Sequence, residues 1–314
     1  MIVALAGGVG AARMLRGITA ITGPLETTAI VNTGDDTVMH GLHISPDLDT
    51  VTYTLAGVIN PATGWGLVGE TWSAMAELRA YSEGRMGWFN LGDRDLGTHL
   101  YRTSRLHEGA TLTEVTAEIA ARWDLPVRLL PMSDDRVETR VVVVEAGGAH
   151  EIGFQDYFVG RQHDVAVREI RLAGVESAAA GPEVLDCIEK ADRIVICPSN
   201  PIVSIGPVLA TGGIGAAVAG RRDHTVAVSP IIAGKALKGP ADRMLAELGH
   251  EPSVVGVARM WAPFAAALVI DEIDAGRAGE VEAAGLRPIV APTVMSGPDE
   301  AAALARVVLN GVRP

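Results

Sequence analysis

The stretch MIVALAGGVGAARML, residues 1–15, passes from an apolar run into a cluster of glycines and then into a helical pattern. The run Ile2–Ala6 contains no polar residue, which is typical of a strand that is covered on both faces. Gly7, Gly8 and Gly10 permit a tight backbone turn, and the N-terminus of the helix that follows can bind a phosphate. The stretch therefore predicts a strand, turn and helix of an α/β sheet, with a candidate phosphate site at Gly7, Gly8 and Gly10.

This glycine turn differs from the two common nucleotide-binding motifs. Arg13 stands where the third glycine of the dinucleotide motif would be, and the lysine of the phosphate-binding P-loop is absent. A glycine turn without a ligand is therefore an open alternative. An NAD-dependent dehydrogenase is disfavoured by Arg13 and by the adjacent acids Asp35 and Asp36, which are too crowded for a single ribose-binding acid.

Further along the chain, apolar runs alternate with helical patterns. We expect strands over Ile2–Ala6, Thr27–Thr33, Arg193–Pro198, Thr225–Ser229, Ser253–Val257, Ala267–Ile270 and Pro288–Val294. We expect helices over Ala11–Ile21, Thr71–Ser82, Thr111–Trp123, Glu183–Lys190, Ala241–Leu248 and Glu300–Leu309. This alternation predicts an α/β fold with a doubly wound, mostly parallel, Rossmann-like sheet.

One segment departs from the alternation. The sequence RVVVVEAGGAHEIGFQDYFV, residues 140–159, reads as two strands about a Gly-Gly turn, which predicts an antiparallel hairpin. We expect this hairpin to flank a more helical insertion that covers about residues 60–180 within a single α/β domain over residues 1–314.

The bulk properties exclude several classes of protein. A chain of 314 residues with 48% hydrophobic and 20% charged residues is globular. Its net charge of −12, with no basic stripe, argues against a nucleic-acid partner. The longest apolar run, Met260–Ile270, is too short to span a membrane, and the opening residues lack the charged region of a signal peptide. With only Cys187 and Cys197, which make no disulfide framework, we expect a cytoplasmic protein, and base rates favour a homodimer.

The stretch IVNTGDDTVMHGLHISPDLDT, residues 30–50, contains four aspartates: Asp35, Asp36, Asp47 and Asp49. The first two follow the carboxyl end of an expected strand, where open α/β sheets place their ligands. The sequence Ser45-Pro46 predicts the start of a helix with the other two in its first turn, where Asp47 complements the helix dipole. The dipole explains one residue and leaves the cluster unexplained. A hard cation such as Mg²⁺, which bridges carboxylates to phosphates, explains the cluster better.

A second acidic pair, Asp93 and Asp95, lies in FNLGDRDLGTHL, residues 89–100. Two interpretations of these acids are equally good: a surface ion pair with Arg94 at the start of a helix, or a functional site. Four of the chain's thirteen aromatic residues lie nearby: Trp65, Trp72, Trp88 and Phe89. They fit either a packed core or a platform for a flat heterocycle.

Two polar loops follow later expected strands. ICPSNPIVSIGP, residues 196–207, carries Ser199, Asn200 and Ser204, and a nucleotide-contacting loop is favoured over a mere connection. SPIIAGKALKGPA, residues 229–241, brings Lys235 and Lys238 to the same edge, where they either cap a helix or neutralise phosphates. No arrangement of serine, cysteine and histidine indicates nucleophilic catalysis.

Eight motifs in matching order resemble the 2-phospho-L-lactate transferases of deazaflavin coenzyme F-420 biosynthesis, from residue 1 to about residue 260. They are GGVGAARML, VNTGDD, SPDLDTVTYTLAG, LGDRDLGTHL, LPMSDDRVET, FQDYFV, PSNPIVSIGP and SPIIAGKALKGPA. A related family of nucleotide-sugar-binding regulators shares the first glycine turn and the Asp35-Asp36 pair, and it is the alternative. The PDLDT and GDRD segments favour the transferases.

The resemblance implies a reaction. A guanosine diphosphate-activated three-carbon acid, lactyl or enolpyruvyl, gives its phospho-acid group to 7,8-didemethyl-8-hydroxy-5-deazariboflavin, and GMP leaves. The arginine-rich composition favours an actinobacterial source and therefore the enolpyruvyl donor.

The resemblance also implies roles for particular residues. Asp49 and Asp35 are implied as catalytic, and Asp35, Asp36 and Asp49 as ligands of Mg²⁺. The implied acceptor-binding residues are Asp49, Asn90, Trp88 and Asp93, with Asn90 a departure because some relatives carry lysine there. The implied donor-binding residues are Gly7, Gly8, Gly10, Arg13, Asn32, Ser199, Asn200, Ser204 and Lys235.

Overall fold

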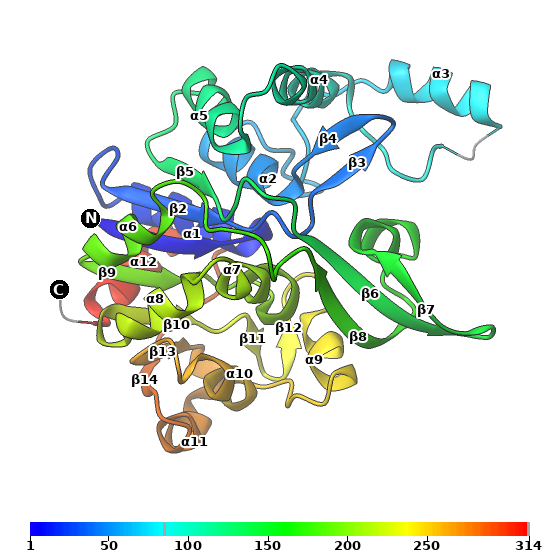
Figure 1. The fold of residues 1–314 in the computed structure, drawn as a ribbon. Coiled ribbons are helices and arrows are strands. Elements are labelled where there is room, and N and C mark those ends of the chain that lie inside the picture. Colours follow the sequence, from blue (N-terminus) through cyan, green and yellow to red (C-terminus); the bar gives the residue numbers. More distant parts are fainter. Residues whose placement is uncertain (84–85, 313–314) are drawn as a thin grey trace.

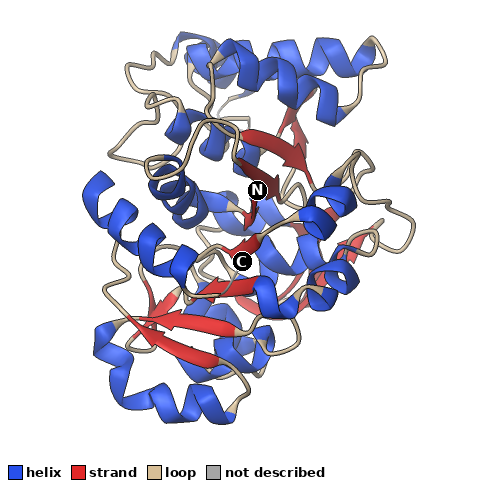
Figure 2. Ribbon diagram, turned by 90° about the vertical axis from the view of Figure 1, so that its left-hand side faces the viewer, coloured by secondary structure: helices blue, strands red, loops and turns tan. Residues whose placement is uncertain are grey.

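A computed structural model describes residues 1–83 and 86–312, and its centre is a seven-stranded parallel sheet (Figures 1 and 2). The strand order is β14-β13-β10-β9-β1-β2-β5. The strands are β1 (Ile2–Ala6), β2 (Thr27–Val31), β5 (Arg128–Pro131), β9 (Arg193–Ile196), β10 (Thr225–Val228), β13 (Ala267–Ile270) and β14 (Arg287–Val290). All six pairings are parallel, so every strand ends at the same edge of the sheet.

The strands lack alternation in the sequence because both faces of the sheet are covered. Ile2, Ala4 and Ala6 of β1 point into one hydrophobic cluster, and Val3 and Leu5 point into the other. Since successive side chains of a strand point to opposite faces, a strand between two helical layers is apolar at every position.

Helices form the two layers (Figure 2). One cluster contains residues of α1 (Gly8–Thr19), α2 (Pro46–Leu55) and α12 (Pro298–Asn310). The other contains residues of α6 (Val184–Lys190), α7 (Gly206–Ala210), α8 (Ile214–Gly220), α9 (Ala241–Glu247), α10 (Val254–Trp261) and α11 (Ala278–Ala283). Helices on both faces of a parallel sheet define the doubly wound α/β class, which confirms the predicted fold class.

The remaining elements lie outside the central layers, where α3 projects from the body (Figure 1). They are the helices α3 (Ser73–Ser82), α4 (Asp93–His107) and α5 (Leu112–Arg122), and the hairpins β3 (Thr37–Met39) with β4 (Leu42–Ile44) and β11 (Ile231–Ile232) with β12 (Lys235–Ala236). A three-stranded antiparallel sheet joins β6 (Glu138–Glu145) to β7 (Gly148–Gly153) and β8 (Ala166–Ala173). Short turns of helix are η1 (Asp156–Gly160), η2 (Pro201–Ile205), η3 (Arg222–His224) and η4 (Glu272–Arg277).

The structure confirms most of the expected elements, including the hairpin β6–β7 and the capping box of α5, in which Thr111 and Glu114 bond each other's backbone. It differs over the insertion of about residues 60–180, because β5 within that range pairs with β2 in the central sheet. The segment therefore forms two separate excursions from the central sheet, one before β5 and one after it.

The expected strand Ser253–Val257 is wrong, since Val254–Trp261 forms α10. The Ser253 hydroxyl accepts hydrogen bonds from the backbone of Val255 and Gly256, which caps the helix. A buried helix and a buried strand are equally apolar over so few residues, so the apolar run did not distinguish them, and Ser253 was the local signal for a helix start. No helix in the described part of the chain is long and apolar enough to cross a membrane.

Candidate active site

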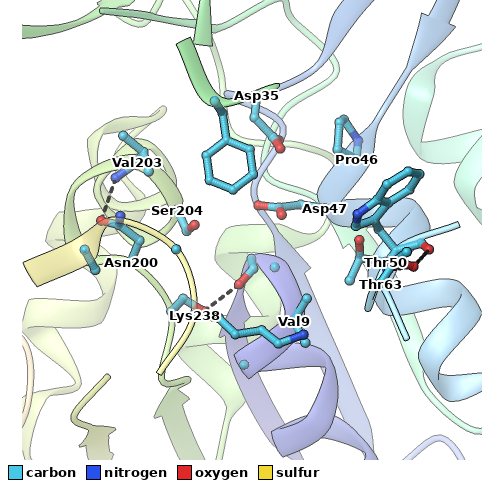
Figure 3. A pocket seen from close by; sticks show the side chains of 18 of the residues that line it. Val9, Asp35, Pro46, Asp47, Thr50, Thr63, Asn200, Val203, Ser204 and Lys238 are labelled. Carbon is cyan, nitrogen blue, oxygen red and sulfur yellow. Dashed lines mark hydrogen bonds between the residues drawn. The ribbon is translucent and has the colours of Figure 1, made fainter. Parts of the chain in front are cut away.

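A cavity of about 660 Å³, the main cavity, opens where the strands of the central sheet end. Its wall includes residues that follow β1, β2, β9, β10 and β14, residues of α2 and α4, and the loop segment 63–66 (Figure 3). The chain continues from β1 to β2 on one side, while β9 pairs with the other side of β1. Open α/β sheets bind ligands at such a switch point, so this cavity is the candidate active site.

The glycine turn after β1 lies in the cavity wall. Gly8 has a φ of +71°, a conformation that side chains disfavour. Gly10 has no room for a side chain, because a Cβ there would lie 2.3 Å from the carbonyl oxygen of Pro198. The Ser199 hydroxyl donates a 2.8 Å hydrogen bond to the Gly7 carbonyl oxygen and thereby joins the turn to the loop after β9. The predicted positions Gly7, Gly8, Gly10 and Ser199 are therefore brought together.

A carboxylate lies against this turn. Asp47, in the first turn of α2, is 7% exposed, and a Cβ on Gly7 would lie 2.6 Å from its Oδ2 atom. Burial raises the pKa of Asp47 to about 6, although hydrogen bonds from Asn32 and the Gly8 backbone oppose the rise. An anionic phosphate at the N-terminus of α1 would meet this carboxylate, unless a cation or a proton lies between them.

Asp35 and Asp47 lie close together in the wall of the main cavity (Figure 3). The Asn32 amide donates to both, at 3.3 Å to Asp35 Oδ1 and 2.9 Å to Asp47 Oδ2. Burial, followed by repulsion from Asp47 and Asp36, raises the pKa of Asp35 well above its ordinary value. Among the described residues, no lysine, arginine or histidine forms an ion pair with either carboxylate. The negative charge of this pair is therefore not compensated by a basic side chain among the described residues.

Asp36 faces a second, smaller cavity of about 210 Å³, together with Trp88 and Arg140. Its Oδ2 atom accepts a 2.6 Å hydrogen bond from the Ser45 hydroxyl. Burial raises the pKa of Asp36 well above its ordinary value, and the Ser45 hydrogen bond opposes that rise. Asp35 lines both cavities, whereas Asp36 lines the second cavity and is absent from the wall of the main one.

Asp49 lies in the main cavity wall but is bound by an arginine. Arg102 of α4 is 2% exposed, and its two terminal nitrogens donate to the two oxygens of Asp49. His99 and Asp95 of the same helix and Tyr53 of α2 extend the cluster, with the Tyr53 hydroxyl donating to Asp95 at 2.7 Å. Against the effect of burial, the contacts with His99 and Tyr53 lower the pKa of Asp95. The negative charge of Asp49 is therefore compensated by Arg102.

The loops after β9 and β10 supply the expected polar residues, except that Lys238 takes the place predicted for Lys235. Asn200 and Ser204 line the main cavity, and the Asn200 side chain also accepts hydrogen bonds from the backbone that begins η2. Lys238 lines the cavity and reaches toward the glycine turn (Figure 3). Lys235, the predicted lysine, is outside the cavity wall; its side chain is 81% exposed and lies 3.6 Å from Asp242.

Arg13 and the chain after β14 close one end of the cavity. The Arg13 side chain donates a 3.1 Å hydrogen bond to the Met295 carbonyl oxygen, and both residues line the cavity. Thr293 beside them is held by Asp271, which accepts from its backbone at 2.9 Å and from its hydroxyl at 2.8 Å. The C-terminal segment, to which sequence analysis gave no role, therefore completes the wall.

The residues predicted to bind the acceptor do not all line the main cavity. Asn90 and Phe89 line the main cavity together with Trp65, whereas Trp88 lines the second cavity and packs edge-on against Phe89 at 5.7 Å. Asp93 lies outside both walls. Its carboxylate accepts hydrogen bonds from the Thr71 hydroxyl and from the backbone at the start of α3, which lower its pKa.

Sequence reasoning missed Tyr53, His99 and Arg102 as site residues. It expected Lys235 and Lys238 at this edge but assigned only Lys235 to the donor, and it left Asp47 out of the predicted metal ligands. A signal was present for part of this set. Asp95, His99 and Arg102 are spaced by four and three residues, so they share one face of a helix. No spacing in the sequence links that face to Asp49.

The aspartates fit a magnesium site of the usual open kind. No group of three or more Asp, Glu, His or Cys side chains forms a ready-made metal centre in the described part of the chain. Mg²⁺ in phosphate-transfer sites is commonly held by one or two carboxylates and the substrate's phosphates. Asp35 and Asp47 meet this requirement, while Asp49 is occupied by Arg102 and Asp36 faces the second cavity.

The fold and the cavity define a doubly wound α/β protein whose ligand site lies at the switch point of its sheet. The family model described as 2-phospho-L-lactate transferase CofD matches residues 2–288. The chain therefore belongs to the 2-phospho-L-lactate transferase family.

Individual relatives agree with this assignment. The chain is 47% identical over 310 residues to a phosphoenolpyruvate transferase of Streptomyces griseus, covering 98% of this chain and 97% of the relative. A phosphoenolpyruvate transferase of Kitasatospora aureofaciens is 45% identical, with 98% and 96% covered. A crystal structure of a Bacillus halodurans protein superposes with a TM-score of 0.64 at 18% identity over 98% of each chain, which shows a shared fold.

Proposed function

We propose that this protein transfers a phosphoenolpyruvyl group from a guanosine diphosphate-activated donor to the terminal hydroxyl of 7,8-didemethyl-8-hydroxy-5-deazariboflavin, in the biosynthesis of coenzyme F-420. The observation that carries the proposal is one cavity whose wall combines residues of three kinds. Lys238 and the glycine turn suit phosphates, Trp65 and Phe89 suit a flat ring, and Asp35 and Asp47 lie in the same wall.

In the proposed reaction, the acceptor's hydroxyl oxygen attacks the phosphorus that carries the three-carbon acid. A new P–O bond forms, the bond between the attacked phosphorus and the bridging oxygen breaks, and GMP leaves with that oxygen and the electron pair of the broken bond. The hydroxyl proton passes to a carboxylate of the cavity wall or to water. Such transfers depend mainly on positioning and on neutralising charge, because the protein itself forms no covalent bond.

The donor end is assigned to the loops after β1, β9 and β10. Lys238 and Arg13 are the basic side chains that line the main cavity in the described part of the chain, apart from the histidine His99. Lys238 can neutralise phosphate charge beside the glycine turn, and Arg13 holds the loop at Met295 that borders the nucleoside end.

Magnesium is proposed as the metal, held by Asp35 and Asp47, and when bound it would neutralise charge on the donor's phosphates. Asn32 orients both carboxylates through its amide group. Because burial raises the pKa of both side chains, they are poorly stable as a bare pair of anions, which favours a cation beside them.

The acceptor end is assigned to the aromatic residues and to Asp49. Phe89 and Trp65 offer apolar surface for the ring, and Asn90 lines the wall beside them with its amide oxygen bound by Arg79. The names of the relatives favour phosphoenolpyruvate as the three-carbon group. A cytoplasmic homodimer stays a prediction.

Incubation of the purified protein with the deazaflavin and each candidate donor tests the proposal, with mass spectrometry of the products. We expect a phosphodiester of the deazaflavin and an equal amount of GMP, only with added Mg²⁺. Sugar-nucleotide binding without deazaflavin binding or turnover would instead identify a ligand-sensing regulator. Undiminished turnover in a metal-free preparation would remove the metal from the proposal.

A further inference from the structure

Asp49 differs from the other aspartates of the main cavity in having a permanent cationic partner. Arg102 Nη2 donates to Asp49 Oδ1, and Arg102 Nη1 donates to Asp49 Oδ2 at 3.2 Å. Asp49 is 6% exposed and Arg102 is 2% exposed. Two parallel hydrogen bonds to a planar guanidinium fix both the position and the plane of a carboxylate.

Arg102 is itself held from a second side. Its Nη1 atom lies 3.4 Å from the His43 carbonyl oxygen and 3.2 Å from His99 Nδ1. A guanidinium only donates hydrogen bonds, so His99 Nδ1 acts as the acceptor and the ring proton is on Nε2. That nitrogen lies 3.4 Å from Asp95 Oδ1, which also accepts from Tyr53. The chain of contacts therefore runs from Tyr53 through Asp95, His99 and Arg102 to Asp49, and within it His99 Nε2 and Arg102 Nε form no hydrogen bond.

This arrangement determines what Asp49 can bind. Each carboxylate oxygen accepts two hydrogen bonds, so each retains one free position after Arg102 is bound. Since its charge is compensated, Asp49 offers these positions to a neutral hydroxyl or amide group more readily than to a metal ion. Asp35 and Asp47 show the opposite condition, because they share one neutral amide and no cation.

We propose that Arg102 and His99 are positioning residues, which hold Asp49 in the cavity wall as a metal-independent acceptor for a hydroxyl of the deazaflavin side chain. The inference rests on the proposed function for the identity of that ligand. Its new content is a division between the carboxylates: Asp35 and Asp47 serve the cation and the donor, and Asp49 serves the neutral polyol of the acceptor.

A buried ionic cluster is seldom the most stable solution for a protein interior, since desolvation offsets most of the attraction. Placed in a cavity wall, the same cluster gives a rigid hydrogen-bonding edge. Lysine at position 102 would keep the charge but lose the planar, two-bonded geometry, so Arg102→Lys separates geometry from charge.

The test is titration of the deazaflavin's fluorescence with protein in EDTA, together with the KM values for acceptor and donor in Mg²⁺. We expect Arg102→Lys and His99→Ala to weaken deazaflavin binding about tenfold or more, since small misplacements are costly in such sites. His99→Asn retains an acceptor near the Nδ1 position and should recover much of the loss. Affinity for GDP should be unchanged in all three.

Arg105→Gln is the matched control, because Arg105 lies on the same helix and pairs with Glu108 and Glu118 at the surface. It should bind the deazaflavin like the wild type. Unchanged acceptor affinity in Arg102→Lys and His99→Ala overturns the proposal, as does an equal loss of acceptor and GDP binding, which would mark a structural role. Wild-type binding of the deazaflavin only in Mg²⁺ also overturns the metal-independent role of Asp49, whereas absence of binding both with and without Mg²⁺ would overturn the proposed function.

Discussion

The buried carboxylate of Asp47 lies against the glycine turn. Its raised pKa makes the free energy of unfolding depend on pH. The folded-state pKa of about 6 lies above the ordinary aspartate value of 3.8. The folded state therefore binds a proton at Asp47 more tightly than the unfolded chain does. Protonation of Asp47 thus contributes to the free energy of unfolding. This contribution is complete below the unfolded pKa and is lost as pH rises through about 6. Above that pH the ionised Asp47 makes no such contribution.

We expect Asp47→Asn to remove this pH dependence. Relative to the variant, the wild type should lose about 2 kcal/mol of unfolding free energy between about pH 4.5 and about pH 8, from roughly 1.4 kcal/mol for each pKa unit. Urea unfolding of both proteins at the two pH values measures it. Asp223→Asn, at a side chain that is 90% exposed, is the control and should show no such difference. Parallel pH profiles for wild type and Asp47→Asn would contradict the expected shift.

The two lysines after β10 give a second prediction about single residues. Lys238→Ala should weaken GDP binding by about 1–3 kcal/mol, the usual range for a charged hydrogen bond. Lys235→Ala should change it by less than about 0.5 kcal/mol, because Lys235 is on the surface beside Asp242. Calorimetric titration with GDP compares them directly. The reverse order of effects would restore Lys235 to the site and remove Lys238.

At this scale the sequence predicts where side chains gather better than which of them are free. The positions of Gly7, Gly8, Asp35 and Ser199 in one wall follow from the rule that parallel strands end at one edge. The state of Asp49 does not follow, because Arg102 is 53 residues away and pairs with it only in the folded chain. Ion pairs between distant elements leave no local pattern.

At Gly10, α1 approaches the loop after β9 so closely that no side chain fits between them. Gly10→Ala would place a Cβ 2.3 Å from the Pro198 carbonyl oxygen, so the helix or the loop must move. We expect a loss of about 1–3 kcal/mol in unfolding free energy, typical of overpacking, and weaker GDP binding. Denaturant unfolding and calorimetry measure the two effects.

Gly97→Ala is the matched control within α4, since nothing lies within 4 Å of a Cβ at that position. It should stabilise the protein by roughly 0.5–1 kcal/mol, because alanine restricts the unfolded chain and favours helix. Equal stability changes in the two alanine variants would show that the space beside Gly10 does not limit the turn.

Among the elements, those with local signals were predicted and those defined by distant partners were not. The capping box of Thr111 and Glu114 and the β-branched strands of the sheet carried their own signals. β5 was missed because Arg128–Pro131 is short and ends in proline, and only its pairing with β2 makes it a sheet strand. Val254–Trp261 was misread because the same apolar residues suit a buried helix and a buried strand.

At the scale of the whole molecule, several buried carboxylates line the main cavity. The chain has a net charge of −12, and four buried aspartates lie in the main cavity wall: Asp35, Asp47, Asp49 and Asp95. Among the described residues, Arg102 is the one buried guanidinium or ammonium group beside them. The fold therefore tolerates excess negative charge where a divalent cation and a phosphate are proposed to bind together.

Mg²⁺ should accordingly stabilise the whole protein in a pH-dependent way. A ligand that binds only the folded state adds about 2.7 kcal/mol when its concentration is about 100 times its Kd, and the melting temperature rises with it. Metal ligands must be deprotonated, so protons compete with Mg²⁺ at Asp35 and Asp47.

Because burial raises the pKa of both side chains, that of Asp47 to about 6, the increase in melting temperature should be large at about pH 8 and small at about pH 5. Thermal unfolding with MgCl₂, against NaCl of equal ionic strength, measures the increase. Asp47→Asn should lose most of it at about pH 8, whereas Asp223→Asn on the surface should keep it. An increase of equal size at both pH values, or in both variants, would assign the stabilisation to diffuse screening of the surface and not to a site between Asp35 and Asp47.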